Sequence, residues 1–183
     1  MARFSAVNTS EAVVAAPREA IWQALTDPAL LPKLTPLLRR IDVAPHDPEL
    51  WTWQLAGLSV LGVGISPVFT ERMHFTTDDD GTGVRIDYTH EPPAGRTEHT
   101  AATGVYQLAD VPGGTRLQIR LELAVELPLP ALSAPAVTRI MQATIRRMGE
   151  RFSANLLRHL GVTEPPAQAA LSGRLRRSPS GER

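Results

Sequence analysis

The sequence predicts an α+β domain in which a curved antiparallel sheet packs against one long C-terminal helix. Three observations predict this fold class. Residues 134–160 show the apolar periodicity of an amphipathic helix. The region 50–127 consists of strand-like segments separated by turn residues, and two short helical segments follow the first strand.

The apolar residues of the segment 134–160 recur at steps of three or four, which places them on one stripe of a helix. Pro135 lies at the start of this helix and Gly161 follows its end. The stripe consists of Val137, Met141, Ile145, Met148, Phe152, Leu156 and Leu160. Burial of each large side chain contributes about 1.5–3 kcal/mol, far more than helix propensity, so the stripe needs a partner surface. We expect the sheet to be that partner and the space between them to be the functional site.

Length and composition fit one domain with a substantial core, since the chain has 183 residues of which 43% are hydrophobic. No run of about 18 apolar residues occurs, and residues 1–14 lack the basic and long apolar regions of a secretory signal. The absence of cysteine excludes disulfides, thiolate metal sites and cysteine nucleophiles. We therefore expect a cytoplasmic protein.

The charge is balanced overall but unevenly distributed. Residues 1–130 hold 10 basic and 16 acidic side chains, a net charge of −6, whereas residues 131–183 hold 9 and 3, a net charge of +6. Two interpretations are open. The basic side chains form the solvated face of the helix and a basic tail, or they attract an anionic membrane or another acidic surface.

The first part of the chain is predicted to form one strand and two short helices. Residues 4–14 alternate loosely between apolar and polar side chains, as in a strand. Pro17 opens a helix that ends before Pro28. Residues 29–41, which contain two prolines, are predicted to form the second short helix.

The region 50–127 is predicted to contain strands alone. The segments are 50–56, 57–67, 69–77, 84–90, 98–108 and 115–127. The last is the clearest, because Leu, Ile and Val alternate with Arg, Gln and Glu along it. The segment 57–67 is interrupted by glycines and is expected to be bent. Residues 162–183 are rich in Pro, Ala, Ser and Arg, and we predict a disordered tail there.

Several motifs carry a resemblance to a known superfamily. They are APREAIWQALTDP (16–28), WTWQL (51–55), the hairpin around GGTRL (113–117) and VELPLP (125–130). In these motifs and in the order of its elements, the chain resembles a bacterial and plastid branch of the START/Bet v 1-like superfamily. This superfamily is also called SRPBCC or polyketide cyclase/dehydrase-like, and the resemblance covers about residues 3–161.

The resemblance implies a helix-grip domain over residues 1–161. In that fold a strongly bent antiparallel sheet of about six to seven strands wraps around the long C-terminal helix and leaves an apolar cavity. It also implies binding of a hydrophobic small molecule such as a lipid, sterol, quinone or polyketide. It does not assign catalysis, because the superfamily contains cyclases and hydrolases as well as carriers.

The turn DDDGTG (78–83) fixes the expected register of one hairpin. If Thr77 lies opposite Val84, then Glu71 lies opposite His90 on the concave face. An ionised carboxylate there is costly without a partner, so Glu71 should be protonated, paired with His90 or bound to a ligand group. The pair is then a polar anchor in an apolar cavity or an acid–base pair. Alternatively, both residues lie at strand ends near the mouth and are wetted by solvent.

His99 opens one further alternative. A tight hairpin would place it opposite His90, so that Glu71, His90 and His99 could form a facial metal site. This spacing matches no known metal signature, and Gly104 leaves the parity of the segment 98–108 open. We therefore expect neither a metal nor a cofactor, and we expect His99 at an exposed hairpin tip.

The remaining candidate ligand-binding residues lie on the inner faces of the predicted strands and helix. They are Trp51, Trp53, Leu55, Phe69, Met73, Phe75, Ile86, Tyr88, Leu117, Ile119, Leu121, Val137, Met141, Ile145, Met148 and Phe152. Such stripes also form ordinary cores, so their role depends on whether a cavity exists. The segment 57–65 is either a gate for ligand entry or a bent edge strand.

These observations lead us to expect a binding or carrier protein for a hydrophobic small molecule rather than an enzyme. The first alternative is a cyclase- or dehydratase-type enzyme that acts on an apolar carbonyl substrate through Glu71 and His90. The second is a peripheral module that docks on a membrane or a partner through the basic helix face. That face lacks interleaved aromatic residues and a recognition motif, so we expect no nucleic-acid partner.

Overall fold

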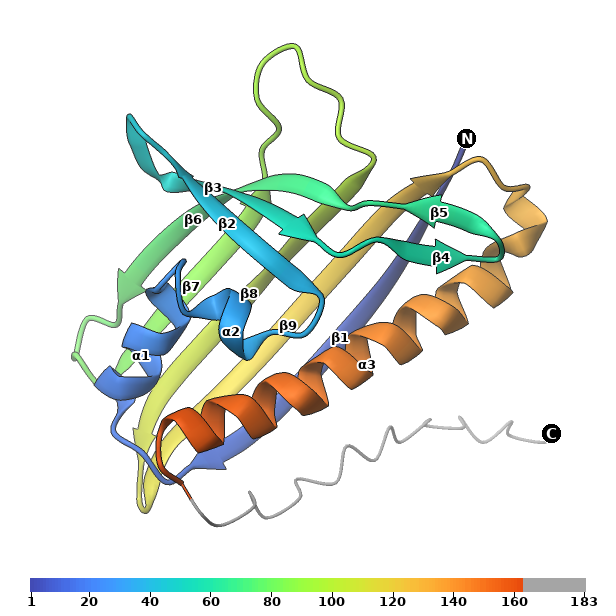
Figure 1. The fold of residues 1–183 in the computed structure, drawn as a ribbon. Helices are drawn as coiled ribbons and strands as arrows, with labels where there is room; N and C mark the ends of the chain where they lie inside the picture. Colours follow the sequence, from blue (N-terminus) through green and yellow to red (C-terminus); the bar gives the residue numbers. More distant parts are fainter. Residues whose placement is uncertain (163–183) are drawn as a thin grey trace, which may run out of the picture.

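The computed structural model describes residues 1–162 (Figure 1). The predicted disordered tail therefore lies almost wholly outside the described residues. Seven antiparallel strands form the main sheet in the order β1-β9-β8-β7-β6-β3-β2. Their bounds are β1 Ala2–Val14, β2 Leu38–Ala44, β3 Asp47–Leu55, β6 Val68–Thr77, β7 Gly83–His90, β8 Thr100–Val111 and β9 Gly114–Leu127.

Four helical segments and one separate hairpin complete the described chain. They are α1 Arg18–Thr26, α2 Leu31–Leu34, the 3-10 turn Ala131–Ser133, α3 Ala134–His159, and the hairpin of β4 Leu58–Val60 with β5 Val63–Ile65. Figure 1 shows α3 running along the sheet beside β1, with α1 and α2 near its C-terminal end and the β4–β5 hairpin near its N-terminal end. This arrangement is the predicted α+β architecture with a long C-terminal helix.

The predicted register of the DDDGTG hairpin is confirmed. Thr77 pairs with Val84, and the same register continues to the pair of Glu71 with His90. The alternation along β9 is confirmed as well, because Leu117, Val125 and Leu127 are buried. The tight turn and the period of two in the side chains were sufficient to define both strands.

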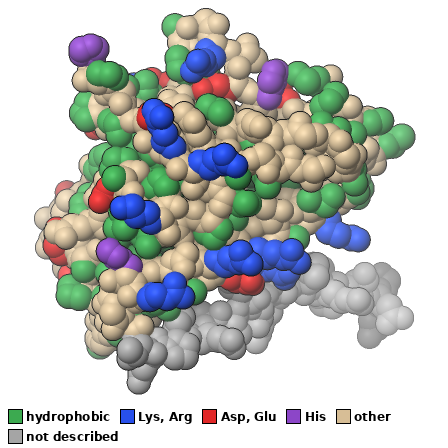
Figure 2. All heavy atoms as spheres, in the orientation of Figure 1, with side chains coloured by type: hydrophobic (Ala, Val, Ile, Leu, Met, Phe, Trp, Pro, Cys, Tyr) green, Lys and Arg blue, Asp and Glu red, His purple; other side chains and the backbone are tan. Residues whose placement is uncertain are grey.

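The stripe and the basic face of α3 lie on opposite sides of the helix, as predicted. The buried residues of the stripe are Val137, Met141, Ile145, Phe152 and Leu156, while Met148 and Leu160 are half-buried. Its exposed arginines are Arg139, Arg146, Arg147, Arg151 and Arg158. Figure 2 shows Lys and Arg side chains along this side of the molecule.

The prediction of a second helix over residues 29–41 was wrong in its second half. Helix α2 ends at Leu34, and the chain enters β2 at Leu38. Leu37 has a φ of 67°, a left-handed conformation that breaks a helix. Pairing with β3 then orders residues 38–44, and this long-range contact overrides the local helical pattern.

The glycine-interrupted segment forms its own small hairpin instead of a strand of the main sheet. Leu61 and Gly62, with φ values of 49° and 83°, provide the turn between β4 and β5. Val60 is buried and packs in a cluster with the N-terminal half of α3. The hairpin therefore covers one end of the domain.

Two separate groups of buried side chains hold the domain together. The larger core joins α1, α2, the inner face of the sheet and the C-terminal half of α3, with Ile21, Leu25 and Leu156 almost fully buried. The smaller core joins β1, β9, β4 and the N-terminal half of α3, with Leu127 and Val137 fully buried. Between the two cores the interior packing is less complete, and the candidate site lies there.

Within residues 1–162, no helix is both long and apolar enough to cross a membrane.

Candidate ligand-binding site

The inner face of the sheet is only partly covered by α3. Leu121 contacts the two cores and is itself half-buried. Other inward residues with the same partial exposure are Trp53, Leu55, Phe75, Tyr106, Ile119 and Met148. These side chains share their strand or helix face with fully buried neighbours, so their exposure reflects incomplete closure between the sheet and the helix. Figure 2 shows hydrophobic side chains reaching the surface between the basic ones on this side.

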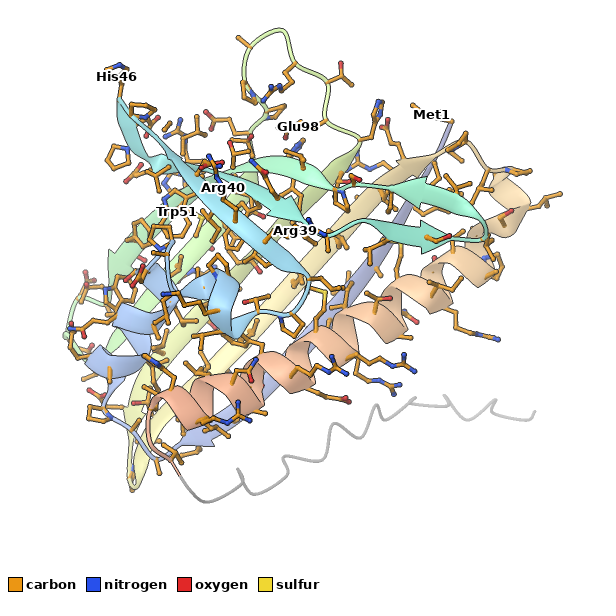
Figure 3. The ribbon with its side chains drawn as sticks, viewed as in Figure 1. Met1, Arg39, Arg40, His46, Trp51 and Glu98 are labelled. Atoms are coloured by element: carbon orange, nitrogen blue, oxygen red, sulfur yellow. The ribbon has the colours of Figure 1, made fainter. Side chains whose placement is uncertain are left out.

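Aromatic side chains from three elements form one wall of this region. Trp53 stacks on Phe69 with a ring separation of 6.4 Å and an interplanar angle of 8°. Trp51, labelled in Figure 3, lies 6.0 Å from Trp53 and 6.3 Å from Phe75. Trp22 of α1 meets Phe75 edge-on at 5.8 Å. These contacts set a rigid, apolar surface across β3 and β6.

Glu71 is the most unusual side chain on this wall. It lies on β6 between Trp51 of β3 and His90 of β7, and only 2% of its surface is exposed. Burial raises the pKa of its carboxyl group well above 4.5, and no hydrogen bond or positive charge opposes this effect. A protonated carboxyl group can both donate and accept a hydrogen bond. Leaving such a group unpaired in the interior costs about 1–3 kcal/mol.

Trp53 provides a second unpaired polar group near Glu71. Its Nε1 is buried and has no hydrogen-bond partner within residues 1–162. By contrast, the Nε1 of Trp51 donates to the carbonyl oxygen of Pro48 at 2.9 Å. Trp53 on β3 pairs with Phe69, and Glu71 on β6 pairs with Trp51. Trp53 and Glu71 therefore lie diagonally across the two strands on the same face. The concave face therefore holds a buried indole N–H without a protein partner and, diagonally beside it, a buried carboxyl group whose pKa no hydrogen bond or positive charge lowers.

Two tyrosines lie on the other side of Glu71. The Tyr88 hydroxyl donates to the carbonyl oxygen of Arg120 at 3.1 Å, and the Tyr106 ring lies 5.4 Å from that of Tyr88. Burial raises the pKa of both phenols, and the nearby Glu71 carboxylate would raise both further, so the two hydroxyl groups stay neutral.

Gly104 is the reason why the sequence left the direction of the Tyr106 side chain open. The register of β8 with β9 is continuous, so Gly104 marks no bulge and Tyr106 faces inward. A Cβ atom at position 104 would collide with the Tyr88 hydroxyl and with the Arg120 carbonyl oxygen. The absence of a side chain at position 104 therefore leaves the room that the Tyr88 ring occupies.

The predicted pairing of Glu71 with His90 does not form between side chains, although their strands pair as expected. Instead, His90 Nε2 lies 3.0 Å from Glu98 Oε2. Glu98 also accepts hydrogen bonds from the amide and hydroxyl of Thr70, at 2.7 and 2.8 Å. The loop before β8 carries this carboxylate back to β6, and its side chain is only 3% exposed (Figure 3). Sequence patterns gave no signal for this contact, because it depends on the path of the loop.

The solvent-wetted alternative is also corrected for Glu71, which is buried, whereas the His90 side chain is 21% exposed. The metal alternative is not supported either. His99 Nδ1 lies 3.2 Å from Glu126 Oε2 on β9, away from His90. In the described part of the chain no three His, Asp or Glu side chains are grouped to hold a metal ion.

The other predicted lining residues lie on the expected faces. Phe69, Met73, Ile86, Leu117, Val137, Met141, Ile145 and Phe152 are buried and serve as core. The outer face carries a different feature, a hollow of about 230 Å³ over β1, β8 and β9. Glu11, Gln107, Gln118 and Arg120 are among the residues that line that hollow, which lies on the opposite face of the sheet from Trp53 and Glu71.

Comparison with solved structures supports the helix-grip fold. A STAR-related lipid transfer protein from Xanthomonas axonopodis has a TM-score of 0.63 at 12% identity, with 85% of each chain covered. A START superfamily protein from Mycobacterium smegmatis has a TM-score of 0.56 at 17% identity, with 86% of this chain and 97% of that one covered.

A third structure, the di-domain ARO/CYC StfQ from the steffimycin biosynthetic pathway, has a TM-score of 0.50 at 15% identity. The match covers 85% of this chain and 49% of that one. No curated protein sequence matches this chain. A family model described as polyketide cyclase/dehydrase and lipid transport matches residues 5–157. The chain therefore belongs to the polyketide cyclase/dehydrase and lipid transport family.

Proposed function

We propose that this protein binds a hydrophobic small molecule between the inner face of the sheet and α3. The observation that carries the proposal is the strip of half-buried apolar residues between two complete cores. Side chains such as Leu121 and Met148 belong to inward-facing positions yet keep accessible surface. Covering that surface with an apolar ligand would release water from it at a gain of about 25 cal/mol per Å².

The family and the similar structures support the same function. The family description includes lipid transport, and the Xanthomonas axonopodis protein is a STAR-related lipid transfer protein. The polyketide cyclase branch remains the enzymatic alternative. However, His90 is engaged by Glu98 and not by Glu71, so the acid–base pair expected for that alternative is not assembled. We therefore propose binding and not catalysis.

The first experiment is a titration with 1,6-diphenylhexatriene, an uncharged hydrocarbon that fluoresces in apolar sites. The protein should take it up with saturable binding. The Leu121→Trp variant would fill the space between the cores and weaken binding at least about tenfold. Val7→Trp is the matched control, because Val7 faces outward on β1 and is 44% exposed. Absence of uptake by the natural protein, together with a ligand-free native mass spectrum, contradicts the proposal.

The basic face of α3 supports a second function, docking on an anionic membrane. Among residues 1–162, only Arg146 of this face forms an ion pair, at 3.9 Å from Glu150. Figure 3 places Arg39 and Arg40 of β2 on the same side of the molecule, and both are exposed. Arg40 is paired with Asp42, but exposed guanidinium groups gathered on one face still favour contact with anionic lipid headgroups.

Co-sedimentation with vesicles tests this second function. Binding to vesicles that contain phosphatidylserine should fall as salt rises from about 0.05 to 0.5 M, because salt screens exposed charges. The double variant Arg147→Gln, Arg151→Gln should weaken it, while Arg116→Gln, Arg120→Gln on the outer face of β9 serves as the control. Equal binding to neutral vesicles would contradict an electrostatic mechanism.

A further inference from the structure

Several polar side chains in the interior of the domain have hydrogen-bond partners within the chain. The Tyr88 hydroxyl reaches Arg120, Thr115 donates to the carbonyl oxygen of Ala16 at 2.8 Å, and Trp51 donates to Pro48. The Trp53 indole nitrogen is buried without a partner within residues 1–162. The buried Glu71 carboxyl group beside it has no hydrogen bond or positive charge that lowers its pKa. Native interiors leave few polar groups unpaired, so these two groups on one face indicate a missing partner.

The chemistry of these two groups restricts that partner. An indole N–H is a donor only, and a carboxyl group buried without a positive partner keeps its proton and is a donor as well. Burial raises the pKa of Glu71 accordingly. Two donors on one wall match an acceptor atom of the ligand, such as the carbonyl oxygen of a ketone or quinone.

A ligand anion would find no compensating charge in this region. Within residues 1–162, the polar or charged residues that are buried as a whole are Thr70, Glu71, Thr100 and Thr115. Arg18 of α1 has a buried Nη1, but its Nη2 pairs with Asp110 at 3.5 Å. The arginines of β6 and β9 that flank the site in sequence, Arg72 and Arg120, alternate onto the outer face. A fatty-acid carboxylate would therefore be desolvated without a cationic partner.

We propose that Trp53 and Glu71 form a polar subsite for an uncharged hydrogen-bond acceptor of the ligand, with the carbonyl oxygen of an aromatic ketone or quinone as the chemical class. Trp53 Nε1 and the Glu71 carboxyl group donate to this oxygen, and the aromatic wall of Trp51, Trp53 and Phe69 packs against the ring. This inference rests on the proposed binding function and specifies its ligand.

Two fluorescent probes separate this subsite from the apolar site as a whole. Prodan, an uncharged naphthyl ketone, shifts its emission to the red when its carbonyl accepts hydrogen bonds, whereas 1,6-diphenylhexatriene has no acceptor. The natural protein should bind both probes, and bound Prodan should emit to the red of Prodan in a hydrocarbon solvent. cis-Parinaric acid, which carries a carboxylate, should bind at least about tenfold more weakly than Prodan.

Conservative substitutions then remove one donor at a time. Trp53→Phe and Glu71→Met should each weaken Prodan binding about fivefold to tenfold and shift its emission to the blue, and they should weaken diphenylhexatriene binding less. Glu71→Gln keeps a donor and should remain within about threefold of the natural protein. Glu122→Met on the outer face of β9 is the matched control for Glu71→Met. Trp22→Phe alters the aromatic wall outside the subsite and should change the binding of both probes equally.

Each alternative result is distinct. Uptake of diphenylhexatriene without Prodan, or equal losses of both probes in the variants, overturns the polar subsite but leaves the apolar site in place. Failure of the natural protein to bind either probe overturns the proposed function itself. Tighter binding of cis-parinaric acid than of Prodan overturns the assignment of an uncharged ligand.

Discussion

The buried carboxyl groups of Glu71 on β6 and of Glu98 in the loop before β8 lie near the same end of β6. They differ in their hydrogen-bond partners. Glu98 accepts two hydrogen bonds from Thr70 and lies 3.0 Å from His90 Nε2. Glu71 has no partner, and burial alone governs its pKa. The fold can therefore satisfy a buried carboxylate at this end of β6, and the local backbone does not force Glu71 to lack a partner. The chain supplies hydrogen bonds to Glu98 and supplies none to Glu71, which we propose as a binding group.

The largest expected effect on stability comes from removing Glu98, the carboxylate that has hydrogen-bond partners. Glu98→Ala removes the acceptor of the Thr70 amide and hydroxyl and leaves both buried, which should lower the free energy of unfolding by about 3 kcal/mol. Glu98→Gln retains one acceptor oxygen and should lose less. Urea denaturation followed by tryptophan fluorescence measures both values. A loss below about 1 kcal/mol in Glu98→Ala would show that the loop before β8 is not held by this carboxylate.

The next effect changes the surroundings of Glu71 through Gly104. Gly104→Ala places a Cβ atom against the Tyr88 hydroxyl and the Arg120 carbonyl oxygen, and the backbone atom cannot move aside. The expected loss in stability is about 2 kcal/mol from overpacking. Thermal unfolding measures it, and Gly149→Ala is the control because a Cβ there meets nothing within 4 Å. Equal melting temperatures of the two variants would contradict the close approach of Tyr88.

A smaller effect, of opposite sign, comes from the unpaired carboxyl group itself. Glu71→Met removes a buried polar group and should raise the free energy of unfolding at pH 7 by about 1–2 kcal/mol in the absence of ligand. The same substitution should weaken binding of a ketone probe. A gain in stability together with a loss in binding is the signature of a functional group. A stability loss at pH 7 would indicate instead that Glu71 is paired.

The pH dependence of stability tests whether the pKa of Glu71 is raised in the folded state. The folded-state pKa of Glu71 lies above the ordinary value of 4.5, so its protonated form favours the folded state. This contribution is fully present below pH 4.5 and is lost as the pH rises through the raised pKa. On β7 and β8, the titratable side chains that share the face of Glu71 are Tyr88, His90 and Tyr106. Urea denaturation between pH 4.5 and 9 should show a decline that is absent in Glu71→Met, and parallel curves would contradict the pKa shift.

The smallest expected effect tests the partner of Glu98. His90→Phe removes one hydrogen bond to a carboxylate that keeps two others, so the stability loss should be about 1 kcal/mol or less. Diphenylhexatriene uptake should be unchanged. A loss as large as that of Glu98→Ala would show that His90 and not Thr70 is the principal partner.

Local patterns in the sequence were sufficient for most of the fold and for one wall of the site. The DDDGTG turn and the alternation of Phe75 and Glu71 defined the hairpin and placed Glu71 inward, because strand periodicity and turn chemistry are local. The spacing of Val137, Met141 and Ile145 likewise predicted the buried face of α3.

Contacts between distant segments decided the rest. Residues 38–44 form a strand only because β3 lies beside them, and Tyr106 could be oriented only after β8 was aligned with β9 across Gly104. The partner of His90 is a carboxylate carried by a loop whose path no periodicity records. The sequence by itself therefore determined that Glu71 faces the interior. Only the tertiary structure decided that this carboxyl group and Trp53 Nε1 lie there without partners, because hydrogen bonding depends on where distant side chains come to rest.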